Sequence, residues 1–197
     1  MGRIKSALEI ALERTETVKS DKASIDQFDA KQRGKKIANA FLADNSIKLA
    51  DEIKNTQAER RQSLKQGLFD VLISQISLPL SKEDEQRIET AGRGLQAVIN
   101  DSRFTSLCKQ LGQALSRYLE ETAQYDEAIR RQYAPKLRQK EEELSRRLGR
   151  EVRLDPFQDP EFTGFYNQNM NALKANYQAA LDQVREEARR LFEAPEK

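Results

Sequence analysis

The stretch Gly149–Phe162, GREVRLDPFQDPEF, separates two long helical patterns and decides how the second half of the chain folds. Gly149 suits the position just after a helix C-terminus, because glycine readily adopts the left-handed conformation found there. Asp159 followed by proline is typical of a helix N-cap with proline in the first turn. A second Asp-Pro step begins at Asp155, and this dipeptide commonly opens a turn. The stretch therefore predicts a corner between two helices.

A heptad pattern runs toward this corner. Its apolar positions alternate in steps of four and three, the spacing of a coiled-coil seam. They are Phe104, Cys108, Leu111, Leu115, Tyr118, Thr122, Tyr125 and Ile129. The spacing shifts around Pro135, which predicts a kink or a stutter there. Cys108, the one cysteine of the chain, sits on the seam and is expected to act as a small buried hydrophobe.

A second apolar stripe follows the corner. It consists of Phe162, Tyr166, Met170, Leu173, Tyr177, Ala180, Val184 and Leu191. Two stripes joined by a short corner predict an antiparallel, coiled-coil-like helical hairpin over residues 101–197, with its turn near residues 149–160. At ~1.5 Å of rise per residue, each arm would be on the order of 45 to 70 Å long.

The first hundred residues predict a separate set of helices that packs on the hairpin or extends it. A first amphipathic helix is expected from about Arg3 to Lys19, with apolar positions Ile4, Leu8, Ala11, Leu12, Thr15 and Val18. SDKASIDQF then predicts a break, and a capping box at Ser24 predicts a second helix that continues to Ile76. From Lys54 to Ser63 the one apolar side chain is Ala58, so this stretch is either a solvated surface of that helix or a break between two helices, and we favour the continuous helix. Ser81 resembles the N-cap of a third helix, which ends near Asn100. The predicted fold class is all-α, an elongated helical bundle.

Composition supports extended helices and excludes several chemistries. Charged residues make up 34% of the chain, yet 34 basic and 32 acidic side chains nearly cancel. Without histidine, the chain lacks the usual general base and the commonest zinc ligand. A single cysteine excludes an internal disulfide and favours a reducing cytoplasm. No run of 18 apolar residues occurs, so no membrane span is expected. We predict a protein that is not an enzyme and holds no cofactor or metal.

Four carboxylates in and beside the corner are the strongest candidate for chemistry: Glu151, Asp155, Asp159 and Glu161. Carboxylates that converge can transfer protons or hold a divalent cation. Their spacing differs from the calcium-loop pattern, which needs ligands at alternate positions and a glycine at the sixth. The turn and capping roles already explain the residues, so we favour a structural corner over a site.

Four aromatic residues gather in the same region: Phe157, Phe162, Phe165 and Tyr166. Exposed aromatic side chains at the tip of a hairpin would be efficient anchors for a protein partner. Alternatively, these side chains could fill the end of the bundle. The sequence favours the second interpretation and leaves the first open as a partner contact.

Two basic clusters offer an alternative function. One comprises Lys31, Arg33, Lys35 and Lys36, and the other lies in residues 130–153 and includes Arg146, Arg147 and Arg150. Such clusters can bind phosphates, and that binding would weaken with salt. However, Glu142 and Glu143 each precede an arginine by four residues, a spacing that allows ion pairs along a helix face. Binding of nucleic acid or another anionic partner is therefore the alternative hypothesis.

The opening residues, MGRIKSALEIALERT, resemble the start of uncharacterised bacterial helical proteins over about the first 20 residues. This resemblance implies a bacterial, cytoplasmic protein and transfers no functional residue. The main hypothesis is a noncatalytic interaction or scaffold protein. Its helical faces would bind a second copy as a homodimer, another protein, or both, because a long two-helix seam leaves apolar surface uncovered.

Overall fold

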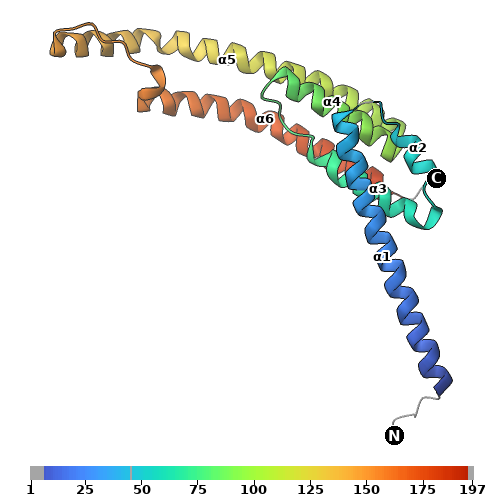
Figure 1. The fold of residues 1–197 in the computed structure, drawn as a ribbon. Helices are drawn as coiled ribbons and strands as arrows, with labels where there is room; N and C mark the ends of the chain where they lie inside the picture. Colours follow the sequence, from blue (N-terminus) through green and yellow to red (C-terminus); the bar gives the residue numbers. More distant parts are fainter. Residues whose placement is uncertain (1–6, 45, 195–197) are drawn as a thin grey trace. The chain divides into compact units, whose positions relative to one another are not determined.

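The computed structural model describes residues 7–44 and 46–194, with side chains from residue 23 onward. Across this described part the fold is all-α, as predicted, with one short 3-10 helix and no strand (Figure 1). The helices are α1 (Ala7–Ala43), α2 (Leu49–Lys54), α3 (Ala58–Ser74), α4 (Lys82–Ile99), α5 (Ser102–Leu148), η1 (Pro156–Gln158) and α6 (Pro160–Glu193). None of these helices has an apolar run long enough to cross a membrane.

The chain divides into two compact units. The first contains the described residues up to Ile76, together with Arg87–Thr105 and residues 188–194. The second contains Ser77–Gln86 and Ser106–Glu187, and so holds most of α5 and α6.

In the first unit, α1 crosses α3 at two glycines. A Cβ atom added to Gly34 of α1 would lie 2.2 Å from the carbonyl oxygen of Leu64 in α3. A Cβ added to Gly67 of α3 would lie 2.0 Å from the carbonyl oxygen of Lys31. Any side chain at either position would overlap the other helix, so the crossing requires glycine on both sides.

Apolar side chains close the first unit around this crossing. Leu64, Leu68 and Leu72 of α3 are fully buried. Also in α3, the ring of Phe69 stacks on the ring of Phe192, with the ring centroids 4.3 Å apart. Leu95 and Val98 of α4 are also buried. The unit is therefore a helical core to which residues far apart in the sequence contribute.

Two predictions about residues 1–76 are wrong. The predicted break at SDKASIDQF is absent, because α1 runs through it to Ala43. The predicted continuous helix from Ser24 to Ile76 is instead interrupted twice, after α1 and after α2. At the first interruption, Asp44 accepts hydrogen bonds from the backbone N–H and the hydroxyl of Ser46, which compete with helix formation. The stripe predicted from Ile4 to Val18 lies outside the residues whose side chains are described.

The predicted starts of α4 and α5 are confirmed. The Ser81 hydroxyl accepts a hydrogen bond from the Asp84 N–H at 3.3 Å, as expected for an N-cap. Asp101 caps α5 by accepting from the Arg103 N–H at 2.8 Å. Between the two helices, Asn100 has a positive φ of 54°, a conformation that asparagine tolerates better than most residues.

The second unit is an antiparallel hairpin of α5 and α6, as the two stripes predict (Figure 1). Helix α5 continues through Pro135. The buried seam residues are Leu111, Leu115, Tyr118, Ile129 and Tyr133 from α5, and Phe162, Leu173, Leu181 and Val184 from α6. Tyr125, predicted on the seam, is 46% exposed. The ring of Tyr118 in α5 packs against the ring of Tyr177 in α6, with the ring centroids 5.1 Å apart.

We predict that Gly34→Ala lowers the free energy of unfolding by about 2 kcal/mol, because the new methyl group would force α1 away from α3. Chemical denaturation followed by circular dichroism would measure the change. Gly112→Ala is the control for helix propensity: a Cβ there meets nothing within 4 Å. That variant should gain up to ~1 kcal/mol. Equal gains in both variants would contradict a close crossing.

Candidate functional site

The corner between α5 and α6 is held by side chains of α5. Gly149 follows the last residue of α5 and has a φ of 64°, so the predicted left-handed glycine is confirmed. Beyond it, the Val152 N–H donates to the Ser145 hydroxyl at 2.9 Å. The Leu154 N–H donates to a carboxylate oxygen of Glu141 at 2.8 Å. The extended segment after α5 thus obtains backbone partners from α5 itself.

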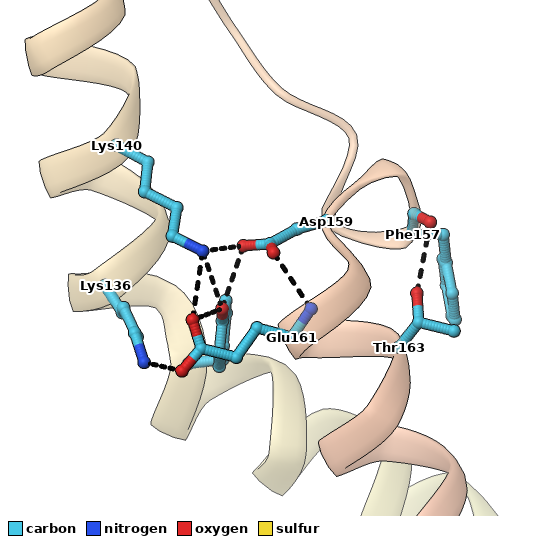
Figure 2. Close-up of polar contacts among 7 residues, drawn as sticks. Lys136, Lys140, Phe157, Asp159, Glu161 and Thr163 are labelled. Carbon is cyan, nitrogen blue, oxygen red and sulfur yellow. Dashed lines mark hydrogen bonds and ion pairs between the residues drawn. The ribbon is translucent and has the colours of Figure 1, made fainter.

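The structure places a cap at both Asp-Pro steps, where the sequence predicted a cap at Asp159 and a turn at Asp155. Asp155 accepts from the Phe157 N–H at 3.0 Å and so caps η1. Asp159 accepts from the Glu161 N–H at 3.1 Å at the start of α6. The Thr163 hydroxyl donates to the Phe157 carbonyl at 3.1 Å and ties η1 to the first turn of α6 (Figure 2).

A cluster of four charged side chains and one phenol joins α5 to the start of α6, and we call it the corner ion cluster: Tyr133, Lys136, Lys140, Asp159 and Glu161. The Lys140 ammonium donates to Asp159 Oδ2 at 2.6 Å and to Glu161 Oε2 at 3.1 Å (Figure 2). The Tyr133 hydroxyl donates to Asp159 Oδ2 at 2.8 Å. Lys136 pairs with the other carboxylate oxygen of Glu161.

These contacts favour the charged forms of the lysine and the carboxylates. Hydrogen bonding from Lys140 is the main cause that lowers the pKa of Asp159 from 3.8 to about 2. The same bond raises the pKa of Lys140. Hydrogen bonds from Lys136 and then Lys140 lower the pKa of Glu161. Burial, followed by the bond to Asp159, raises the pKa of the Tyr133 phenol. The two lysines and two carboxylates of the cluster are therefore fixed ions near neutral pH, and the Tyr133 phenol is neutral.

The corner carboxylates that sequence analysis singled out do not form one group. Glu151 pairs with Arg153 at 3.3 Å, and Asp155 caps η1. Asp159 and Glu161 do come together, but around the ammonium of Lys140. Among the residues whose side chains are described, no group of three cysteine or acidic side chains is arranged to hold a metal. The geometry of the corner is that of a helix connection fastened by ion pairs.

The four predicted partner-contact aromatics lie together beside the corner. Phe162 is fully buried and contacts the Tyr133 ring edge to face at 5.1 Å. Phe165 and Tyr166 are half-buried and pack on the same cluster. Phe157 is 44% exposed, with the Arg130 guanidinium 5.1 Å from its ring centroid. Phe162 thus fills the end of the hairpin, and Phe157 covers it while keeping one side toward solvent.

Several residues of the first basic cluster contact acidic side chains. Lys31 pairs with Asp70 at 2.8 Å, and Arg33 pairs with Glu52 at 3.0 Å. Lys35 is half-buried. Burial by itself would raise the pKa of Asp70, but the pKa is lowered overall, and Lys31 and the charge of Lys35 both contribute to this lowering. Lys36 is exposed.

In the second basic cluster, the ion pairs expected from the sequence are present. Arg147 lies 2.5 Å from Glu143, and Arg146 lies 3.8 Å from Glu142. Arg150 is exposed just beyond the end of α5. Much of the positive charge in both clusters is therefore balanced by neighbouring carboxylates.

An apolar groove opens on the hairpin, and we call it the hairpin groove. It has a volume of about 410 Å³ and is lined by eleven residues between 107 and 115 of α5 and between 177 and 187 of α6. Leu111 and Leu181 form its buried floor. Ala114 is half-buried and Ala180 is exposed, so two small side chains keep the groove open.

Sequence reasoning found only part of the hairpin groove. Of its floor, Leu111 belongs to a predicted stripe, whereas the stripe placed Ala180 on the seam where the structure buries Leu181 and leaves Ala180 exposed. Leu107 and Ala114 belong to neither stripe. A sequence signal for the groove was present, because Leu107, Leu111 and Ala114 are spaced by four and then three residues. This spacing places a second line of apolar residues next to the seam. Sequence reasoning also missed that Lys140 and Tyr133 meet Asp159, since no local spacing connects residues 19 and 26 positions apart.

Comparison with known proteins gives one family. A family model described as Family of unknown function (DUF6657) matches residues 50–190. This range contains the corner ion cluster and the hairpin groove, and it does not include the first 20 residues that suggested the sequence resemblance. No curated protein and no solved structure matches the chain significantly.

We predict that Asp159→Asn lowers the melting temperature near neutral pH, because asparagine can keep the helix cap but loses the ion pair with Lys140. The loss should be about 1 kcal/mol. Since the pKa of Asp159 is lowered to about 2, its charge stabilises the fold above pH ~4. That contribution disappears as the pH falls to about 2.

Thermal unfolding of both proteins across this pH range would test the prediction. The difference between wild type and variant should shrink from pH 4 to pH 2. In a Lys140→Met background, Asp159→Asn should have a smaller effect, because the partner is already gone. A difference that stays constant with pH, or an undiminished effect in the Lys140→Met background, would contradict the ion-pair assignment.

Proposed function

The chain belongs to the Family of unknown function (DUF6657), and we propose that it is a noncatalytic helical interaction protein that binds a helix of a protein partner in the hairpin groove. The observation that carries this proposal is the composition of the groove. Of its eleven lining residues, Glu187 is the one that is charged, although 34% of the whole chain is charged. Depletion of charged residues is the compositional mark of an interface core.

The geometry of the hairpin supports a helix as the bound element. Two packed helices leave a furrow along each side of their seam, and the side chains of a third helix can interdigitate there. In the hairpin groove, the small side chains of Ala114 and Ala180 let another backbone approach closely. Above its buried floor, the half-buried side chains of Leu107 and Tyr177 are available for contact with an apolar stripe.

The corner ion cluster supports a structural rather than a catalytic role. General acid–base catalysis needs groups with a pKa near the working pH. Contacts in the cluster move the pKa values of Asp159 and Lys140 away from neutrality in opposite directions. Both groups therefore stay charged, and their ion pair holds the two helices together. A fixed pair of helices is what a rigid binding surface needs.

Binding of nucleic acid or another anionic partner through residues 31–36 and 130–153 stays a prediction. The ion pairs of Lys31, Arg33 and Arg147 weigh against it, because they reduce the positive charge that phosphates would meet. Cytoplasmic location likewise stays a prediction from the sequence.

Site-specific photo-crosslinking would test the proposed function. A diazirine-bearing amino acid in place of Ala180 should crosslink to protein in cells of the source organism. The same amino acid in place of Ala179 is the matched control, because both alanines are exposed neighbours on α6 and Ala180 lines the groove. Each crosslinked product would be identified by mass spectrometry.

The result expected is a product at position 180 that is missing at position 179. No protein product at position 180, or equal products at both positions, would overturn the proposal that the groove binds a protein.

A further inference from the structure

We draw no further inference here: the strongest candidate, the surface patch that the exposed apolar side chains of Ile25 and Phe28 form on α1, carries nothing because nothing in the structure shows what covers it.

Discussion

The hairpin depends on one constraint: two long helices must end next to each other without leaving buried backbone groups unpaired. The end of α5 and the start of α6 expose carbonyl and N–H groups that need partners. Gly149 turns the chain with a left-handed conformation, and Asp159 caps the new helix. Between them, Ser145 and Glu141 of α5 bind the N–H groups of the connecting segment. The antiparallel packing of α5 against α6 follows from this closed corner.

Much of the hairpin could be predicted because its signals are local. A heptad stripe, a glycine after a helix and an Asp-Pro cap each act within a few residues, so the sequence alone indicates them. The boundaries between residues 20 and 57 could not be predicted in the same way. SDKASIDQF has the composition of a turn, yet α1 passes through it and packs across α3 at Gly34. Tertiary contact decides the structure there, and local propensity is a weak guide.

The candidate sites show the same division. The turn at Asp155 and the cap at Asp159 were predictable from dipeptides, whereas the place of Lys140 between two carboxylates depends on which turns of α5 and α6 meet. The hairpin groove was predictable only in part: Leu111 of its floor lies on a predicted stripe, but Leu181, Leu107 and Ala114 do not. A two-helix seam buries one line of residues from each helix and leaves the flanking line exposed.

The corner ion cluster also determines the alignment of residues far from it. A heptad seam by itself permits two helices to slide past each other by whole repeats with little change in apolar contact. The pairing of Lys140 with Asp159 is available in one alignment only, because a shift of one helical turn, ~5.4 Å, would separate the charges. A polar contact at a single level is a known means of fixing register in coiled coils. Whether Ala114 faces Ala180 at the groove is thus decided at the opposite end of the hairpin.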